Sequence, residues 1–398
     1  MPQKSTEFLG QSVDERRRGN TEVSRPNVET TPRRVLILTT AYLPEVGGSE
    51  LAIKNITDRL PEIYFDLITS RSSKNLPEYE KMGAVNVYRV GNSISLFSFL
   101  LPKNFLPIAV FFKARQLMRQ YGPYDIIHAY QASQAAGGGW LLKWRYPQIP
   151  FLVTVQEGKV LNRQSWTMKF FRYLILRKAD AVTAISNYLA QYVRSQNSRV
   201  PVSIIPNGVD VSKFKPDGEH NSKTIITTSR LVEKNGIGDL IDAVDVVKKE
   251  IPDIKLFIAG GGHLREGLKL KVKSLKLENN VEFIGEVSND LLPQYLAKAS
   301  IFVRPSLSEG LGTAFLEAMA AGLAVIGTSV GGIPDFLKDG ETGLFCKVAN
   351  PEDLADKIIR LIKDDGLRNR LSDSGRRLVQ EKYNWDKVAK EIQNVYSQ

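Results

Sequence analysis

The chain has 398 residues, of which 42% are hydrophobic and 24% are charged, a composition typical of a soluble globular protein with two domains. It contains one cysteine, Cys346, and three histidines, which excludes an internal disulfide and leaves few ligands for a zinc site. No run of about 18 apolar residues occurs and the N-terminus is polar. We therefore expect a cytoplasmic protein without a membrane span, a secretion signal, a bound metal or a cofactor.

The formal net charge of +11 is unevenly distributed. Residues 1–205 hold 27 Lys and Arg against 15 Asp and Glu, whereas residues 206–398 hold 27 against 28. The segment Lys103–Lys178 contains 12 basic residues and only two acidic ones, Asp125 and Glu157. Such a field attracts an anionic partner, which could be phospholipid, a phosphorylated acceptor or nucleic acid.

The first 34 residues are polar and lack apolar periodicity, so we expect residues 1–34 to form a disordered tail. The sequence VLILTTAY then predicts a buried strand, and it is followed by a turn at Gly47 and Gly48. An amphipathic segment ending near Leu60 predicts a helix. Strand, glycine turn and helix are the typical opening of a doubly wound domain.

The same alternation continues along the chain. The segments FDLITS, AVNVYRV, DIIHAY, FLVTV, ADAVTAIS and VSIIP predict strands of a first domain, residues 35–206. After a turn cluster and a polar linker, TIITTS, IKLFIAG, NVEFIG, SIFVRP and LAVIGTS predict strands of a second domain, residues 207–384. Short buried strands separated by helices imply parallel sheets. The predicted fold is α/β, with two doubly wound Rossmann-like domains facing each other across a cleft and ligands at the carboxyl ends of the strands.

The segment SEGLGTAFLEAMAAG, Ser308–Gly322, predicts a loop and a helix with an unusual carboxylate. On a helical wheel Phe315, Leu316 and Met319 share one side. Glu317 lies opposite, among small residues and without another charge. This pattern indicates close approach by a polar ligand; the alternative is a capped core helix with incidental acids.

Glu309 lies in the glycine-containing loop that precedes the same helix. Free N–H groups and the helix dipole at this end favour phosphate. Carboxylates accept hydrogen bonds from hydroxyls, so Glu309 and Glu317 together suit a ligand with phosphates and vicinal hydroxyls. A nucleotide sugar has both.

Two further segments point to the same class of ligand. In SVGGIPD, Gly331 and Gly332 follow a strand and would let backbone amides approach an anion closely. In SRLVEKNG, Arg230 ends a strand with Lys234 and Gly236 nearby, and a guanidinium there would suit a diphosphate. The alternative for Arg230 is an ordinary surface arginine.

The order of these motifs resembles glycosyltransferase family 4, whose members are retaining enzymes of the GT-B fold. The matching text is YLPEVGGSE, ADAVTAIS, IPNGVD, RLVEKNG, the Glu309 and Glu317 pair and VGGIPD, and it covers nearly everything after Arg34. The resemblance implies transfer of a sugar from a UDP-, GDP- or ADP-sugar to a lipid-linked or glycan acceptor. It also implies an oxocarbenium-like transition state and no metal.

The resemblance also implies roles for single residues. Glu309 would contact the donor sugar and Glu317 the ribose, while Arg230 would neutralise the leaving diphosphate. Residues 385–398 would cross back onto the first domain. Other donor-binding positions implied are Gly47 and Gly48, which leave room for the donor, Ile284, which borders the base, and the amides of Gly310, Leu311, Gly312, Thr313, Gly331 and Gly332.

The chain departs from the family pattern at two positions. Asn235 stands where relatives usually carry a lysine, with Lys234 one residue earlier, so leaving-group stabilisation needs Lys234 or another cation to turn inward. Gln156 stands on the expected acceptor side, where many relatives place a histidine, and it cannot titrate. These changes raise an alternative function, a nucleotide-sugar-binding pseudoenzyme or partner protein. His128, at a strand's end in DIIHAY, is predicted to meet the acceptor; the alternative is a satisfied core histidine.

Two segments of the basic half are candidates for a membrane contact. Ser93–Leu106 is unusually apolar for a loop, and Trp140–Tyr146 mixes aromatic with basic residues. Such residues suit a headgroup interface, so we expect a peripheral contact with an anionic membrane surface at the inner face of the cell membrane. The alternative is core packing, since Pro107–Gln120 and Trp166–Ala179 must bury apolar faces. No nucleic-acid-binding module is recognised, so nucleic acid is not expected as a partner.

Overall fold

The computed structural model describes residues 33–45, 47–91, 105–156, 165–216 and 221–398. Most of the predicted polar tail and most of the apolar segment Ser93–Leu106 lie outside the described residues. The predictions made for those two segments therefore stay predictions.

In the described part of the chain, the first domain is built on an eight-stranded sheet with the order β3-β4-β2-β1-β5-β6-β7-β8. All neighbouring strands are parallel except β3 and β4, which pair antiparallel. The strands are β1 Arg34–Leu38, β2 Tyr64–Ser70, β3 Tyr79–Met82, β4 Val85–Val90, β5 Ile126–Tyr130, β6 Phe151–Val155, β7 Ala181–Ala184 and β8 Val202–Ile204.

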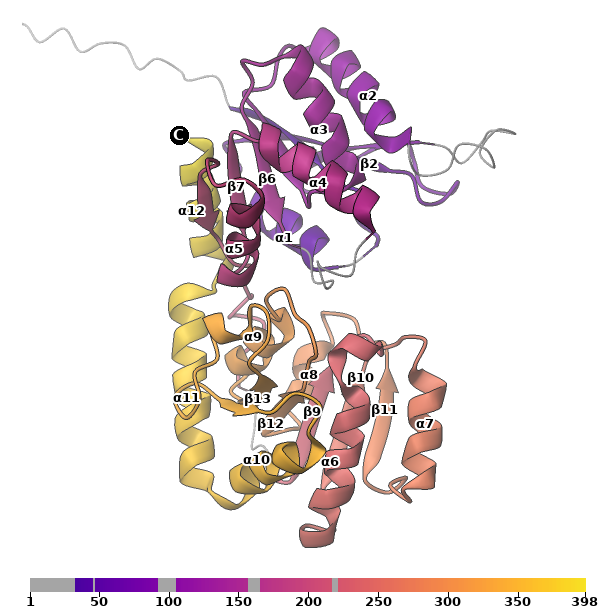
Figure 1. Cartoon of the computed structure of the whole chain (residues 1–398), viewed down its shortest axis with the longest axis vertical. Coiled ribbons are helices and arrows are strands. Elements are labelled where there is room, and N and C mark those ends of the chain that lie inside the picture. Colours follow the sequence, from indigo (N-terminus) through magenta and orange to yellow (C-terminus); the bar gives the residue numbers. More distant parts are fainter. Residues whose placement is uncertain (1–32, 46, 92–104, 157–164, 217–220) are drawn as a thin grey trace, which may run out of the picture. The chain divides into compact units, whose positions relative to one another are not determined.

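Helices cover both faces of this sheet (Figure 1). Because side chains alternate along a strand, Leu36 and Leu38 of β1 join one apolar core, whereas Val35 and Ile37 join another. The first core is completed by α2 Leu106–Tyr121, α3 Gln134–Arg145, α4 Trp166–Lys178 and α5 Asn187–Gln196, and the second by α1 Gly48–Thr57 and α12 Trp385–Tyr396.

The described part of the second domain holds a six-stranded parallel sheet with the order β11-β10-β9-β12-β13-β14. Its strands are β9 Thr224–Thr228, β10 Lys255–Ala259, β11 Val281–Gly285, β12 Ile301–Arg304, β13 Ala324–Thr328 and β14 Leu344–Cys346. Its helices are α6 Ile237–Glu250, α7 Arg265–Ser274, α8 Leu292–Leu296, α9 Thr313–Ala320, α10 Pro351–Lys363 and α11 Asp365–Lys382, with short turns η3 Glu233–Asn235 and η4 Ile333–Asp335. The two sheets, which are parallel except for the pair β3 and β4, confirm the predicted α/β fold class.

The C-terminal helix α12 packs on the first sheet although it follows the second domain in sequence. The Val209 N–H donates to the Tyr383 carbonyl at 2.6 Å, and Val209 pairs with Asn384 in an isolated parallel bridge. A Cβ at Gly208 would lie 2.9 Å from the Trp385 amide nitrogen, so a larger residue there would push the chain away. The crossing is thus fixed by backbone contacts and by the apolar face of α12.

Candidate active site

Three loops of the second domain meet at the carboxyl ends of neighbouring strands. Strands β9, β12 and β13 lie side by side in the sheet, and the loops that follow them carry Arg230, Glu309 and Gly331 respectively. The Leu307 N–H donates to the Lys234 carbonyl at 2.7 Å, which joins the first two loops. Parallel strands end at one edge of a sheet, so residues far apart in sequence become neighbours there.

The Glu309 carboxylate is held by two cations and a backbone amide. It forms an ion pair with Arg304, and its Oε1 lies 3.9 Å from the Lys234 Nζ. The Gly310 N–H also donates to this oxygen at 3.1 Å. Only 11% of the Glu309 side chain is exposed. The carboxylate is therefore fixed in orientation, with its remaining lone pairs able to accept hydrogen bonds from ligand hydroxyls.

Arg304 is a residue that the sequence analysis did not identify. It ends β12, and it is nearly buried beside Glu309. Its Nε donates to the Ser306 Oγ at 3.2 Å, its Nη1 donates to the Thr228 carbonyl at 3.5 Å, and its guanidinium carbon lies 5.1 Å from the centre of the Phe315 ring. A basic residue closing the apolar strand IFVR is the signal that could have revealed it, because buried arginines need a partner.

Lys234 turns toward Glu309, as the substitution of the family lysine by Asn235 would require. Desolvation lowers the pKa of the Lys234 ammonium, the charge of Glu309 raises it, and Arg304 and Arg230 lower it further. Asn235 has a different task, because it is buried and its Nδ2 donates to the Arg230 carbonyl at 2.6 Å. The side-chain amide of Asn235 thus fixes the conformation of the loop, and Lys234 supplies the positive charge.

Arg230 follows the end of β9, and its side chain is exposed. A guanidinium in this position is open to an anion arriving from solvent. Its positive charge contributes to lowering the pKa of Lys234.

Glu317 lies on α9, and its carboxylate accepts no hydrogen bond from any residue that the structure describes. Burial raises the pKa of this carboxyl to about 7, although Arg304 and Lys213 partly offset the increase. A carboxylate that is desolvated and unpaired is costly unless a ligand supplies hydrogen-bond donors. Such a residue marks a candidate binding site.

The glycines of the site are required mainly because the loops approach each other closely. Gly331 has a φ of +56°, and a Cβ there would lie 1.8 Å from the Glu309 carbonyl oxygen. A Cβ at Gly332 would lie 2.2 Å from the Gly310 carbonyl oxygen, and the Gly332 N–H donates to the Glu309 carbonyl at 3.4 Å. The Gly332 amide is thus engaged by the neighbouring loop, whereas the sequence analysis assigned it to the ligand.

The remaining donor-side residues differ in position. Gly312 precedes α9 with a φ of +99°, a conformation that favours glycine, and Thr313 opens the helix. Leu311 is buried in the core. Ile284 lies on the edge strand β11, and strands β10 and β9 separate it from β12 and the Glu309 cluster.

A second group of polar residues gathers at the carboxyl ends of strands in the first domain. Asn207 Nδ2 donates to Gln156 Oε1 at 3.4 Å, and a Cβ at Gly48 would lie 3.8 Å from the same Nδ2. Gly47 precedes α1, where a Cβ would meet the Glu50 carboxylate.

Gln131 belongs to this group, although the sequence analysis did not identify it. Its φ of +68° is unusual for a residue with a side chain, and its Nε2 donates to the Ser49 Oγ at 3.2 Å. The Ser49 hydroxyl donates in turn to Glu50 at 3.0 Å.

His128 is a core residue, so its predicted contact with an acceptor is wrong. The ring is fully buried in β5, with Nδ1 2.7 Å from the Tyr396 hydroxyl and Nε2 2.6 Å from the Thr154 hydroxyl. Burial lowers the pKa of the imidazole to about 3. Both nitrogens are satisfied inside the protein, as the alternative of a core histidine required.

Among the residues that the structure describes, no group of three or more His, Cys, Asp or Glu side chains could hold a metal ion. The helices of this described part include none with the length and apolar character needed to cross a membrane.

Two family models match the chain. The model for Glycosyltransferase Family 4 matches residues 46–213, and the model for Glycosyl transferases group 1 matches residues 209–378. Similar solved structures include sucrose-phosphate synthase from Thermosynechococcus elongatus, with a TM-score of 0.78 and 21% identity over 92% of this chain and 98% of that one. HepE of Anabaena, in complex with UDP and glucose, has a TM-score of 0.74 and 19% identity over 92% and 99% of the two chains.

Relatives with similar sequences are also named as enzymes that transfer sugars. An uncharacterized glycosyltransferase of Methanocaldococcus jannaschii is 28% identical over 91% of this chain and 98% of its own length. The N-acetyl-alpha-D-glucosaminyl L-malate synthase of Bacillus anthracis is 28% identical over 89% and 94%. A GDP-mannose-dependent alpha-(1-6)-phosphatidylinositol monomannoside mannosyltransferase of Mycobacterium tuberculosis is 28% identical over 57% and 65%.

The predicted family and GT-B fold are confirmed: this chain belongs to the glycosyltransferases of family 4 and group 1.

Proposed function

We propose that the protein transfers a sugar from a UDP-, GDP- or ADP-sugar to a lipid-linked or glycan acceptor, with retention of configuration and without a metal. The observation that carries this proposal is the charged cluster of Arg304, Glu309 and Lys234 beside the unpaired Glu317. Two carboxylates and two inward-facing cations match a ligand that has hydroxyls and a diphosphate.

Departure of the diphosphate is the step that needs most stabilisation. The bond between the sugar's anomeric carbon and the phosphate oxygen breaks, the acceptor oxygen bonds to that carbon on the same face, and the acceptor proton passes to the leaving phosphate. Lys234 and Arg230 offset the developing negative charge, and Glu309 orients the sugar through its hydroxyls. Arg304 keeps the Glu309 carboxylate in place.

Glu317 is proposed to bind the ribose. Its carboxylate has no hydrogen-bond donor in the described residues, and ribose hydroxyls would supply two. Such bonds favour the ionised carboxylate, so nucleotide binding would lower the raised pKa of Glu317. The complex of HepE with UDP and glucose supports a nucleotide sugar as the ligand class.

The acceptor is proposed only as a broad class, because the relatives are named for different acceptors. The Mycobacterium tuberculosis relative is named for phosphatidylinositol monomannoside, and the Bacillus anthracis relative is named for L-malate. We propose a lipid-linked or glycan acceptor, used in the cytoplasm or at the inner face of the cell membrane.

A panel of UDP-, GDP- and ADP-sugars tests the function. We expect one donor class to shift the thermal unfolding of the unmodified chain and to be consumed when lipid and glycan acceptors are supplied. Glu317→Ala should abolish the shift, and the exposed Glu278→Ala is the matched control. Failure of every donor to bind would refute the proposal. Binding without transfer to any acceptor would support the alternative, a nucleotide-sugar-binding protein without activity.

A further inference from the structure

Three consecutive helices of the first domain carry charges of one sign. Helices α2, α3 and α4 together contain nine Lys and Arg residues and no Asp or Glu. These helices lie next to one another on one face of the sheet (Figure 1). A one-sided positive field of this kind attracts an anionic surface.

The same helices expose large apolar side chains. Trp166 is 76% exposed, Trp144 65%, Phe171 62% and Phe112 60%. All six residues of Trp166–Phe171, the first half of α4, are exposed. Clustered exposed aromatics mark a surface that another phase or partner covers.

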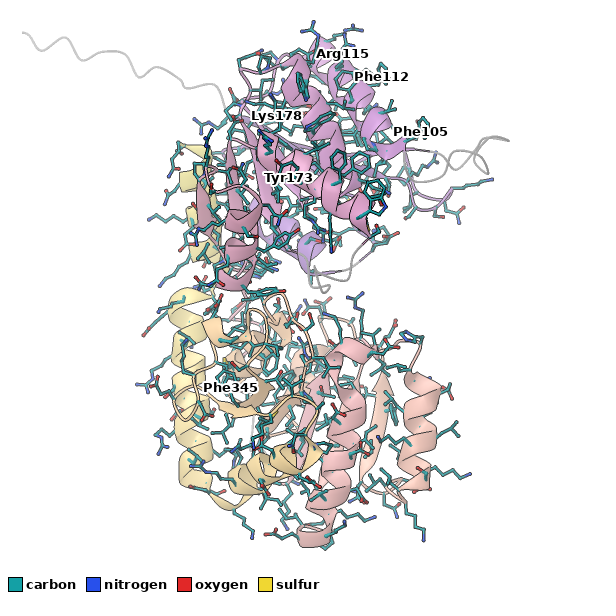
Figure 2. All side chains as sticks on the ribbon, viewed as in Figure 1. Phe105, Phe112, Arg115, Tyr173, Lys178 and Phe345 are labelled. Atoms are coloured by element: carbon teal, nitrogen blue, oxygen red, sulfur yellow. The ribbon has the colours of Figure 1, made fainter. Side chains whose placement is uncertain are left out.

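Cations and aromatic rings are interleaved on these helices. The Lys178 Nζ lies 4.6 Å from the centre of the Trp144 ring, and the Arg177 Nη1 donates to the Tyr173 hydroxyl at 2.7 Å. Figure 2 shows Phe105, Phe112 and Arg115 at α2 and Tyr173 and Lys178 on α4. Amphipathic rings with neighbouring cations suit the headgroup layer of an anionic bilayer, where the ring enters the acyl boundary and the cation meets phosphate.

A hollow on α2 offers a place for one phosphate. It has a volume of about 420 Å³, and it is lined by Phe112, Arg115, Gln116, Arg119 and Gln120. The Arg115 Nε is buried and has no hydrogen-bond partner in the described part of the chain. A buried guanidinium nitrogen without a partner is satisfied if an anionic oxygen binds there.

We propose that α2, α3 and α4 form a surface that binds the headgroups of an anionic bilayer. This lipid-facing surface is defined by Phe105, Ile108, Phe112, Arg115, Arg119, Trp144, Trp166, Met168, Lys169, Phe170, Phe171 and Lys178. It deepens the proposed function, because a lipid-linked acceptor would be held next to the enzyme. From the sequence we predicted the contact at Ser93–Leu106 and Trp140–Tyr146, with core packing by Pro107–Gln120 and Trp166–Ala179 as the alternative. Helices α2 and α4 do bury one face, and their other faces are the surface proposed here.

Flotation of the full chain with vesicles tests this proposal. We expect binding to phosphatidylcholine vesicles that contain phosphatidylglycerol, little binding to phosphatidylcholine alone, and loss of binding when salt is raised from about 0.1 M to about 1 M. The double variant Arg119→Gln, Lys178→Gln should bind roughly thirtyfold more weakly at low salt. The triple variant Trp166→Ser, Phe170→Ser, Phe171→Ser should lose binding at any salt concentration.

Matched controls come from the second domain. Lys249→Gln changes an exposed cation, and Leu270→Ser changes an exposed apolar residue, and both should bind vesicles like the unmodified chain. Absence of binding to anionic vesicles at low salt would overturn the proposal. So would binding that the double and triple variants leave unchanged, or binding to an acidic protein or RNA that competes equally with vesicles.

Calorimetric titration with the donor nucleotide separates the two proposals. Variants that lose vesicle binding while keeping nucleotide affinity support the lipid-facing surface and leave the site in the second domain intact. If the unmodified chain did not bind any donor nucleotide, the proposed function would be refuted. The vesicle experiment would still test the lipid-facing surface independently.

Discussion

The two domains share an architecture, a parallel sheet covered by helices, but they present different surfaces. Every exposed Phe, Trp and Tyr side chain in the described residues belongs to the first domain. The exposed large apolar residues of the described second domain are all aliphatic, namely Leu270, Leu291, Leu307 and Val348. The excess positive charge also lies in the first half of the sequence. The fold therefore does not dictate which surface a domain displays.

The polar side chains near the carboxyl ends of the central strands also differ between the domains. In the second domain, Arg304, Lys234 and Glu309 form a cluster at the ends of neighbouring strands, with Glu317 on the adjoining helix. In the first domain, the polar residue at the corresponding strand, His128, is neutral and enclosed. This contrast fits the two proposals made above, in which the second domain binds the donor and the first domain binds the membrane surface.

Removing the charge of Glu309 should have the largest effect of the changes considered, and it should act on the rate of sugar transfer. We expect Glu309→Gln to lower kcat for sugar transfer by about 10²–10³-fold. Arg304 and Lys234 would lose their anionic partner, and the sugar hydroxyls would lose a charged hydrogen-bond acceptor. Initial rates at saturating donor measure this. Glu341→Gln, an exposed change in the same domain, should leave the rate unchanged, and vesicle binding should be unaffected by either variant. A normal rate for Glu309→Gln would contradict the proposal that the charged cluster of the second domain carries the reaction.

Replacement of His128 should affect stability without affecting donor affinity. His128→Phe leaves the Tyr396 hydroxyl buried without a partner and should cost about 1–3 kcal/mol of unfolding free energy. The unfolded chain takes up a proton on His128 below about pH 6.5 and the folded chain does not, so the unmodified protein loses stability as the pH falls from 6.5 towards 3. The variant should lack this loss.

Urea unfolding at pH 8 and pH 5 measures both effects, with the exposed His263→Phe as the control. If His128→Phe instead abolished transfer at full stability, the imidazole would belong to the reaction and the assignment to the core would fail.

Neutralising Glu317 should stabilise the empty protein. The folded pKa of about 7 lies above the unfolded value, so the unfolded state ionises first and the unmodified protein loses stability as the pH rises from about 4.5 to 7. Glu317→Gln should therefore be more stable than the unmodified chain by about 1–2 kcal/mol at pH 8, with the gain vanishing near pH 4.5. Thermal unfolding across this range checks the sign. Equal stability at pH 8 would mean that Glu317 is solvated or paired.

Chelation should have the smallest effect. With EDTA present we expect transfer to continue at an unchanged rate, because Lys234, Arg230 and the start of α9 carry the diphosphate. A rate that falls with EDTA and returns with a divalent ion would show that the second domain's own charges do not suffice.

Much of the fold could be predicted because buried strands and helices alternate in the sequence with distinct periods. Glu309 and Glu317 could be singled out as candidates because each stands alone in an apolar or glycine-rich context, and their roles stay predictions. Arg304 was missed since its meaning depends on a partner five residues later in a loop whose conformation is set by tertiary packing.

His128 illustrates a different limit. Its two partners, Thr154 and Tyr396, lie 26 and 268 residues away in the sequence, so only the assembled sheet and α12 reveal that the ring is enclosed. Gly331 and Gly332 were assigned to an anion, whereas the carbonyls of Glu309 and Gly310 provide their steric reason. A sequence pattern can indicate that space is needed without indicating what fills it.

The position of α12 has a consequence for synthesis. The ribosome completes all eight strands of the described first sheet before it makes the second domain. Helix α1 covers part of one face of that sheet early, but the rest of this face stays uncovered until Trp385, Ile392 and Tyr396 emerge. Domains usually fold as units in the order in which they are made. Here the domain that begins first is finished last, and a nascent chain must keep an apolar sheet face from aggregating while nearly two hundred further residues are added.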